Sequence, residues 1–296
     1  MNNWGIDLGG TKIECAVLDE NNQVRIRKRI ATEAANGYQH ILSQIKTLVD
    51  QVAGELGEQP LRVGFATPGV LEPSSRLMKN SNTTVLNGMP LQKDLEAKLG
   101  VSVKLANDAN CFALAEALMG IGKEYKTDVV FGVIMGTGVG GGLVVNGKII
   151  EGLHGIAGEW GHNELEPGGV DCYCGKKGCV EKVIAGPSLE AYYLSISGEQ
   201  KKLQEIVAAY KAGNDTYASQ TIERLLEYYG KAVSVLVNIL DPGLIVIGGG
   251  VGNVDELYSE GYERIKKYVF NKGILNTPIR KPLLGDSAGV FGAALL

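Results

Sequence analysis

Hydrophobic positions along this chain follow two different periods, and these alternate from one segment to the next. Between residues 38 and 56, apolar side chains recur every three or four positions, which predicts an amphipathic helix. Residues 61–67 form a short apolar run that ends at Pro68-Gly69, as expected of a buried strand. Strands that alternate with helices are typical of largely parallel sheets covered by helices. The same patterns predict further helices at 91–99, 109–119, 219–240 and 255–270, strands at 101–106 and, with its turn, 244–250, and a final helix of small residues.

Two stretches consist instead of an apolar strand, a glycine-rich turn and a second strand. They cover residues 4–19 and 129–145, so the chain repeats its opening unit near its middle. The repeat predicts two related α/β domains. We expect the first over residues 1–120 and the second over residues 121–285, with a helix at about 286–296 packed back on the first.

The composition limits the kinds of partner that the protein can have. The chain of 296 residues carries 29 lysines and arginines against 33 aspartates and glutamates, a net charge of −4. Its densest basic run, at 24–29, is too short for a phosphate-binding stripe. The uncharged run at 129–145 contains six glycines and is too short to span a membrane, and residues 1–6 do not resemble a signal peptide. We therefore expect a cytoplasmic protein that binds neither nucleic acid nor membrane.

The two glycine-rich turns are candidate phosphate-binding loops. The second turn, GTGVGG, matches GxGxxG, but a strand follows it, whereas a dinucleotide-binding turn opens a helix. The chain also lacks the GxxxxGK[ST] motif of P-loop proteins. Bare backbone N–H groups in such turns can hold phosphate oxygens, so one loop from each domain would hold one nucleotide. In the second loop, the hydroxyl of Thr137 would assist in binding phosphate. In the first loop, Lys12 would supply a positive charge and Asp7 would lie on the side of the magnesium ion. For either turn alone, a plain glycine hairpin is the alternative.

The segment 158–181 concentrates residues that bind metals. It holds three of the five cysteines and one of the three histidines, with glycines between them that permit tight turns. Four such ligands leave no open coordination position, which predicts a structural zinc site. The ligands would be His162, Cys172, Cys174 and Cys179. Ordinary loop cysteines or a disulfide are the alternatives, although the expected reducing compartment disfavours a disulfide.

Two glutamates flank this cluster. Glu159 lies three residues before His162, so both share one face of a helical turn, and Glu181 follows the last cysteine by two residues. Carboxylates accept paired hydrogen bonds from vicinal hydroxyls. While one imidazole nitrogen of His162 holds the metal, we expect the other to be free for a further hydroxyl. The set suits a polyhydroxylated ligand such as a sugar, and two solvated loop charges are the alternative.

Asp108 follows a predicted strand and begins a predicted helix. We expect it to be buried and to serve either as the helix N-cap or as a catalytic base. The neighbouring Asn107 and the acids farther along the chain favour the base, because a sugar hydroxyl that attacks phosphorus needs a proton acceptor.

In their order along the chain, these motifs resemble the ROK family of sugar kinases and related repressors. The resemblance spans nearly the whole chain and rests on DxGGTK near the start, PG at 68–69, NDAN at 107–110, GTGxGGG at 136–142, GEWGH at 158–162, CxCGxxGCxE at 172–181 and GGG after a late strand. Segments such as KNSNTTVLNG and CYCGKKGC are most similar to bacterial fructokinases and manno(fructo)kinases. The resemblance implies the actin/hexokinase-like ATPase fold, with the active site in a cleft between two related α/β domains.

The resemblance also implies a role for each motif. Asp108 would be the base, and the zinc ligands would be the four residues named above. The sugar would bind to Gly69, Asn82, Asn107, Asp108, Glu159, His162 and Glu181. ATP and Mg²⁺ would bind beside Asp7, Gly9, Gly10, Thr11, Lys12, Gly136, Thr137, Gly138, Gly140, Gly249 and Gly250. One position departs from the common family pattern: three residues after Asn82 the family often has Trp, and Val85 stands here at the wall of the sugar pocket.

The activity that the resemblance implies is transfer of the γ-phosphoryl group of ATP to the 6-hydroxyl of a hexose, by a homodimer. Fructose or mannose is favoured, and glucose and N-acetylglucosamine are the alternatives. A sugar-responsive repressor is the alternative of a different class. Such repressors carry a helix-turn-helix arm before the sugar-binding body, whereas the first loop here begins at Asp7. A chaperone-like or cytoskeletal ATPase of the same fold would have no use for zinc-held acids.

Overall fold

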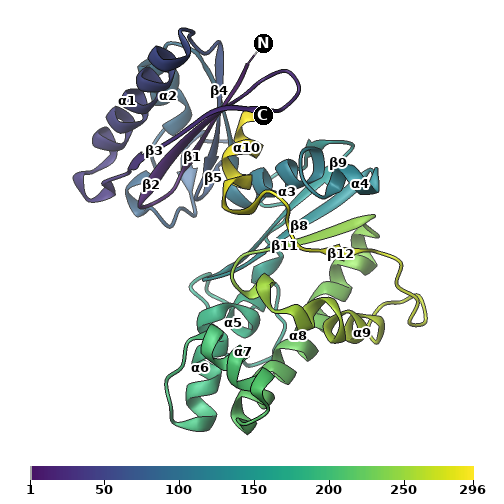
Figure 1. Cartoon of the computed structure of the whole chain (residues 1–296). Coiled ribbons are helices and arrows are strands. Elements are labelled where there is room, and N and C mark those ends of the chain that lie inside the picture. The colour runs from purple at the N-terminus through teal and green to yellow at the C-terminus, as the bar shows by residue number, and fades with distance from the viewer. Residues whose placement is uncertain (1) are drawn as a thin grey trace. The chain divides into compact units, whose positions relative to one another are not determined.

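The computed structural model describes residues 2–296, which divide into two compact units (Figure 1). The first unit consists of residues 2–123, 147–157 and 284–296, and the second of residues 124–146 and 158–283. Each unit has its own sheet and its own hydrophobic core.

The first unit is built on a five-stranded mixed sheet. Its strands lie in the order β3 (Val24–Ala31), β2 (Lys12–Leu18), β1 (Asn3–Leu8), β4 (Arg62–Thr67) and β7 (Ser102–Asn107). β1, β2 and β3 are antiparallel neighbours, whereas β1, β4 and β7 run parallel. The strand-turn-strand predicted over residues 4–19 is therefore confirmed, as are the strands predicted at 61–67 and 101–106.

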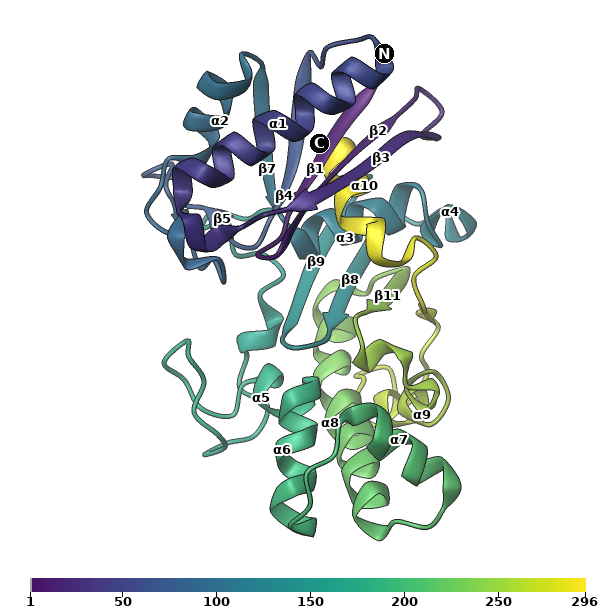
Figure 2. The same cartoon turned by 60° about the vertical axis from the view of Figure 1, so that its left-hand side comes forward.

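Helices cover both faces of this sheet. α1 (Tyr38–Leu56) and α2 (Leu91–Leu99) lie on one face, and α3 (Asp108–Leu118) and α10 (Ala288–Ala294) lie on the other (Figures 1 and 2). α1 buries its apolar stripe against the strands and ends at Gly57, whose left-handed φ of 68° closes the helix. The predicted helix at 38–56 is confirmed. Shorter elements of this unit are η1 (Ala34–Asn36), β5 (Val70–Leu71), β6 (Met78–Lys79), η2 (Thr84–Leu86), β10 (Lys148–Ile149) and η6 (Gly285–Ser287).

The backbone of α10 lies directly on the sheet. A Cβ atom on Gly5 would overlap the carbonyl oxygen of Val290, and a Cβ atom on Gly64 would overlap that of Ala293. Gly292 of α10 meets the carbonyl oxygen of Cys111 in α3 in the same way. Glycine at these positions is therefore a condition for the close packing of the last helix.

A buried carboxylate holds the backbone beside the first and the last of the four places where the chain passes between the units. Glu116 in α3 is fully buried, and its two oxygens accept hydrogen bonds from the backbone N–H groups of Ile121 (3.2 Å) and Leu284 (2.8 Å). The chain first passes to the second unit after residue 123 and last returns to the first unit at residue 284. One side chain thus fixes the backbone beside these two crossings.

The second unit has strands β9 (Val139–Val145), β8 (Val129–Met135), β11 (Leu244–Gly248) and β12 (Ile279–Arg280), side by side in that order. β8 and β9 are antiparallel, while β11 runs parallel to β8 and β12. The strand-turn-strand predicted at 129–145 and the strand at 244–250 are confirmed. The helical elements are α4 (Gly122–Tyr125), which begins in the first unit, η3 (Trp160–His162), α5 (Val180–Ile184), α6 (Gly186–Ser197), α7 (Leu203–Ala212), α8 (Thr216–Leu240), η4 (Val251–Asn253), η5 (Asp255–Tyr258) and α9 (Glu260–Lys266).

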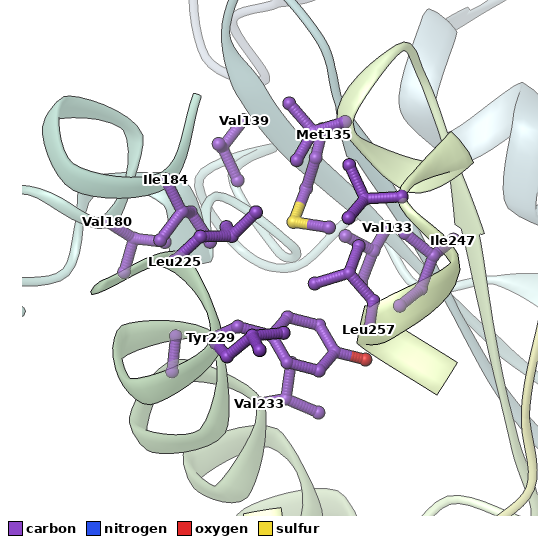
Figure 3. Close-up of a cluster of buried hydrophobic side chains, with 14 of the residues drawn as sticks. Val133, Met135, Val139, Val180, Ile184, Leu225, Tyr229, Val233, Ile247 and Leu257 are labelled. Carbon is purple, nitrogen blue, oxygen red and sulfur yellow. The ribbon is translucent and has the colours of Figure 1, made fainter. Parts of the chain in front are cut away.

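The core of this unit forms where α8 and α5 meet the strands. Leu225, Tyr229 and Val233 of α8 share one buried cluster with strand residues such as Val133 and Ile247 (Figure 3). Full burial of each such side chain stabilises the fold by about 1.5–3 kcal/mol. Crossing a bilayer requires a helix of about 20 predominantly apolar residues, and no helix within residues 2–296 meets that requirement.

Three features differ from the sequence predictions. The helix predicted at 255–270 is interrupted at Ser259, whose φ of −113° and ψ of −84° are not helical, and so it becomes η5 and α9. The long helix begins at Thr216 instead of 219, because Asp215 caps it by accepting a hydrogen bond from Ala218 N (2.9 Å).

The third difference concerns residues 147–157, which the sequence placed in the second domain and which belong to the first unit. Lys79 Nζ donates to the carbonyl oxygen of His154 (3.1 Å), and Ile149 packs against a buried cluster that includes Ala66 and Cys111. These contacts join segments far apart in the sequence.

Candidate active site

Asn107 and Asp108 lie where β7 ends and α3 begins. Asn107 caps the helix, since its Oδ1 accepts a hydrogen bond from Ala109 N (2.9 Å). Asp108 Oδ1 also accepts from Ala109 N (2.8 Å), and the residue is exposed. The expectation that Asp108 is buried is therefore wrong: as the first residue of α3 it projects from the end of the helix, and the residue before it supplies the cap. An exposed carboxylate at this place is accessible to a substrate hydroxyl.

Asp7, near the end of β1, is a second carboxylate in the same unit. The pKa of Asp7 is raised to about 6, chiefly by burial and also by the charges of Asp108 and Glu14, against smaller opposing effects of Lys12 and Arg29. Gly289 leaves room for it, since a Cβ there would lie 3.0 Å from Asp7 Oδ2. A divalent cation beside Asp7 and Asp108 would favour the ionised form of both carboxylates. The site therefore fits the predicted magnesium.

The first glycine-rich turn is fixed from both sides. Gly9 N donates to the carbonyl oxygen of Lys12 (3.0 Å), and Thr32 Oγ1 donates to that of Gly9 (2.6 Å). Gly10, Thr11 and Lys12 are exposed at the tip of the turn. The tip can therefore approach a phosphate group with its backbone.

Gly69 and Asn82 lie beside each other in the first unit. Asn82 N donates to the carbonyl oxygen of Pro68 (3.4 Å), and a Cβ on Gly69 would lie 2.6 Å from the carbonyl oxygen of Lys79. Thr67, which sequence reasoning missed, is buried and donates to the carbonyl oxygens of Gly69 (2.8 Å) and Ala106 (3.2 Å). It thereby ties the Gly69 turn to the strand that leads to Asn107.

The second glycine-rich turn and Gly249-Gly250 come together in the second unit. Gly249 has a left-handed φ of 83°, and a Cβ there would overlap the carbonyl oxygen of Met135. Gly186 N donates to the carbonyl oxygen of Gly136 (2.9 Å), which brings the start of α6 to the same place.

A pocket of about 630 Å³ opens beside these turns. Its lining combines Gly136, Thr137 and Gly250 with residues that the sequence did not single out, namely Gly186, Pro187, Glu190, Lys202, Leu203, Gln204, Val207, Val251, Asn253 and Val254. Glu190 is held in place, since it accepts hydrogen bonds from Lys202 Nζ (3.0 Å) and Leu203 N (3.1 Å). A lining that combines glycine-rich turns with apolar side chains is suited to a nucleotide.

The four predicted zinc ligands converge. One ligand atom from each of His162, Cys172, Cys174 and Cys179 lies within 4.8 Å of all the others, and the cysteines are not joined by disulfides. His162 Nδ1 lies 3.6 Å from Cys172 Sγ, and Cys174 Sγ lies 3.6 Å from Cys179 Sγ. Tetrahedral zinc with Zn–S bonds of about 2.3 Å places its sulfur ligands about 3.8 Å apart. The residues therefore fit a structural zinc ion.

The loop that carries these ligands is anchored to α8. Glu166 accepts hydrogen bonds from Arg224 Nη2 to both carboxylate oxygens (2.8 Å each) and from the hydroxyl of Tyr228 (2.9 Å). Arg224 in turn stacks over the rings of Tyr192 and Tyr228. This anchor attaches the loop to α8 at Glu166.

Glu159, His162 and Glu181 lie near one another beside the metal cluster. Burial raises the pKa of Glu159, the charge of His162 lowers it, and that of Glu181 raises it. Glu181 also reaches the second glycine-rich turn, since its Oε2 accepts from Val139 N (3.1 Å). The expectation of a free imidazole nitrogen on His162 is wrong, because Nε2 is hydrogen-bonded to the hydroxyl of Tyr173 (3.0 Å).

Comparison with known proteins decides the family. The model of the ROK family matches residues 3–296. The N-acetyl-D-glucosamine kinase of Vibrio atlanticus (strain LGP32) is 38% identical over 304 residues, which cover 99% of this chain and 98% of that protein. The chain belongs to the ROK family. The N-acetyl-D-glucosamine kinase of Aliivibrio fischeri (strain ATCC 700601 / ES114) is a further ROK relative, 36% identical over 99% of this chain and 98% of that protein.

Solved ROK structures share the fold. The ROK hexokinase from Thermus thermophilus has a TM-score of 0.90 and 32% identity, covering 100% of this chain and 97% of that one. A ROK glucokinase from Streptomyces griseus, solved with glucose and AMPPNP, has a TM-score of 0.79 and 25% identity, covering 99% and 98%. The predicted actin/hexokinase-like fold is thereby confirmed.

The residue that departs from the common ROK pattern lies against the core of the first unit. Val85 belongs to η2 and is half-buried, and it packs on the same hydrophobic cluster as α1 and β1. Its neighbour Thr83 is buried, with its hydroxyl 3.2 Å from the Cβ position of Gly10. The segment after Asn82 therefore connects the core to the first glycine-rich turn.

Proposed function

We propose that this ROK-family chain is an ATP-dependent sugar kinase that phosphorylates the 6-hydroxyl of a hexose. The observation that carries the proposal is the contact of Glu181 with Val139 N. It joins a residue of the predicted sugar-binding set to the turn that would hold the phosphates. Phosphoryl transfer depends chiefly on positioning. This hydrogen bond fixes a predicted sugar-binding residue relative to the predicted phosphate-binding turn.

In the proposed reaction, Asp108 accepts the proton of the sugar 6-hydroxyl as its oxygen attacks the γ-phosphorus of ATP. The new bond joins that oxygen to phosphorus, the bond from phosphorus to the β,γ-bridging oxygen breaks, and ADP leaves. Mg²⁺ beside Asp7 would neutralise charge on the phosphates. The exposed position of Asp108 at the start of α3 leaves its carboxylate accessible for this step.

The second unit would bind the nucleotide and orient the sugar. The pocket beside Gly136, Thr137 and Gly250 would take the base and ribose against its apolar wall, with the phosphates toward the glycines. Glu159 and Glu181 would accept hydrogen bonds from the sugar hydroxyls, and His162 would donate one to a sugar hydroxyl. A zinc ion on His162 and the three cysteines would hold that loop as a structural centre and would take no part in the transfer.

We propose N-acetyl-D-glucosamine as the first sugar to test. The sequence motifs favour fructose or mannose, whereas the curated relatives at 36% and 38% identity are named N-acetyl-D-glucosamine kinases. The relatives match over 99% of the chain, so their name supports the acetamido sugar more strongly than short motifs support fructose.

A coupled assay of ADP release tests the function and the sugar together. Purified, zinc-loaded protein would be assayed with ATP and Mg²⁺ against N-acetyl-D-glucosamine, N-acetyl-D-mannosamine, glucose, mannose and fructose. We expect the highest kcat/KM with N-acetyl-D-glucosamine, and a value roughly 10²- to 10⁴-fold lower, or lower still, for the matched Asp108→Asn variant. Folded protein that turns over none of these sugars would refute the kinase proposal, while turnover led by fructose would refute only the choice of sugar.

A further inference from the structure

Tyr173 occupies the imidazole nitrogen that the proposed function assigns to a sugar hydroxyl. Its hydroxyl lies 3.0 Å from His162 Nε2, and the two rings meet edge to face with centroids 5.2 Å apart at 87°. The Tyr173 side chain is nevertheless 74% exposed. It therefore covers a functional atom without being buried by its surroundings.

The direction of this hydrogen bond follows from the other side of the imidazole ring. His162 Nδ1 faces the cysteine sulfurs, 3.6 Å from Cys172 Sγ. When Nδ1 holds the metal, the ring proton is on Nε2, so Nε2–H donates to the oxygen of Tyr173. A sugar hydroxyl oxygen would accept from the same N–H, and a single N–H cannot serve both partners well.

The backbone on either side of Tyr173 is held independently of the Tyr173 side chain. Tyr173 stands between Cys172 and Cys174, two of the four residues that fit a zinc ion. Cys172 N donates to the carbonyl oxygen of Lys176 (2.8 Å), and Gly175 N donates to that of Cys172 (3.0 Å). The ring can therefore turn about its own side-chain bonds while the ligands on either side stay in place.

The Tyr173 hydroxyl is hydrogen-bonded to the imidazole nitrogen at which the proposed function places a sugar hydroxyl. We propose that Tyr173 is a positioning residue that competes with the sugar for His162 Nε2 and thereby sets the affinity for the sugar.

This inference rests on the proposed function, in which His162 binds the substrate. In the sugar-free protein, Tyr173 holds the imidazole in the orientation that the metal requires. When the sugar binds, the tyrosine hydroxyl is exchanged for a sugar hydroxyl and the ring turns toward solvent. A net hydrogen bond shifts an equilibrium by roughly 2- to 10-fold, which is the expected size of the competition.

The first test is the Tyr173→Phe variant, with Tyr217→Phe as control. Tyr217 is a partly exposed tyrosine on α8, outside the zinc loop. We expect Tyr173→Phe to lower the KM for the best hexose by roughly 2- to 10-fold, with kcat, the KM for ATP and the zinc content unchanged. An unchanged sugar KM would show that the tyrosine does not compete, and a raised KM would show that it binds the sugar itself. Either result overturns the inference.

The second test does not depend on activity. The chain has only three histidines, so ¹⁵N-selective NMR can resolve the Nε2–H signal of His162 in zinc-loaded protein. We expect this signal to differ between wild type and Tyr173→Phe without sugar and to coincide at saturating hexose. Identical signals without sugar would refute the contact. If wild type phosphorylates no hexose, the proposed function fails, and the sugar-free comparison still decides the contact.

Discussion

Glu181 accepts a hydrogen bond from the backbone N–H of Val139 over 3.1 Å, and so links the zinc-loop side of the second unit to its glycine-rich turn. A Cβ on Gly138 would lie 2.6 Å from the same carboxylate oxygen, so the contact also requires glycine there. One residue is therefore shared between the predicted sugar site and the predicted phosphate site.

A Glu181→Gln variant separates the two roles of this side chain. The amide oxygen of glutamine can still accept from Val139 N, so we expect the fold and the KM for ATP to be preserved. The charged acceptor for sugar hydroxyls is lost, which should raise the sugar KM by roughly 10- to 100-fold, the usual size for a hydrogen bond to a charged group. Steady-state kinetics measures this, with the exposed Glu164→Gln of the same loop as control. Equal sugar KM values in both variants would remove Glu181 from the sugar site.

Asp108→Asn tests the proton acceptor. Because Asn107 caps α3, the substitution should leave the stability nearly unchanged. We expect kcat to fall by roughly 10²- to 10⁴-fold or more, with sugar and ATP binding retained, as is typical when a general base is removed. Titration calorimetry measures the binding of sugar and ATP, and single-turnover kinetics measures the chemical step. Turnover close to wild type would leave Asp108 without a catalytic role.

The pKa of Asp7 predicts a dependence of stability on pH. Folding raises this pKa from 3.8 to about 6, so the protonated carboxyl is favoured in the fold and the ionised one is disfavoured. The stabilising contribution of Asp7 to the free energy of unfolding is therefore fully present below pH 3.8 and is lost as the pH rises through about 6. At pH 8 and without Mg²⁺, Asp7→Asn should be more stable than wild type by about 2–3 kcal/mol.

Thermal unfolding of wild type and Asp7→Asn between pH 4.5 and 8 measures this difference. Asp128→Asn, at an exposed aspartate of the second unit, serves as the control and should follow the wild-type curve. Parallel curves for Asp7→Asn and wild type would show that the ionised Asp7 carries no cost in the fold.

Loss of the metal should act on the sugar rather than on the nucleotide. Cys174→Ser removes one of four converging ligands, and a chelator competes with all four for the metal, so either treatment should release about one zinc per chain. Because Glu159, His162 and Glu181 adjoin this loop, we expect the sugar KM to rise at least about 10-fold, the lower end for loss of metal-site support. Metal analysis and kinetics test this, with Cys15→Ala, in β2, expected to retain zinc. A zinc-free wild-type preparation with full activity would contradict it.

Glu116 gives a prediction about stability alone. Glu116→Ala removes the acceptor of the buried N–H group of Ile121 and of the partly buried N–H group of Leu284, and a buried group without an acceptor costs about 1–3 kcal/mol. We expect urea unfolding to show a loss of about 1–4 kcal/mol, because the partly buried group contributes less, and a smaller loss for Glu116→Gln, which keeps one acceptor. Glu124→Ala, at an exposed glutamate, is the control. A loss below 1 kcal/mol for Glu116→Ala would mean that other groups can replace the carboxylate.

Local features of the sequence were sufficient to predict the elements whose cause is local. The helix at 38–56 follows from its apolar stripe and from Gly57, and both hairpins follow from strands that flank glycines. The zinc cluster was predictable because its ligands fall within 18 residues of one another, where the turns leave few ways to separate them.

Features that depend on tertiary packing were not predictable from local patterns. Nothing in residues 147–157 indicates that they belong to the first unit, because the partners Lys79 and Cys111 are distant in the chain. Lys202 and Glu190 line the pocket beside Gly136 only because α6 and α7 pack there. The exposure of Asp108 depends on Asn107 taking the cap, and local spacing allows either residue to do so.

The position of α10 has a consequence for the order in which the protein is made and folded. β1 to α3 are translated before α10, but the part of their sheet around Gly5 and Gly64, on which the α10 backbone packs, stays uncovered until residues 284–296 have been added. By then residues 158–283 have already emerged and can assemble their own core around α8. The half of the protein that is translated first is therefore completed last. A nascent chain stalled before residue 284 should expose apolar strand surface to chaperones.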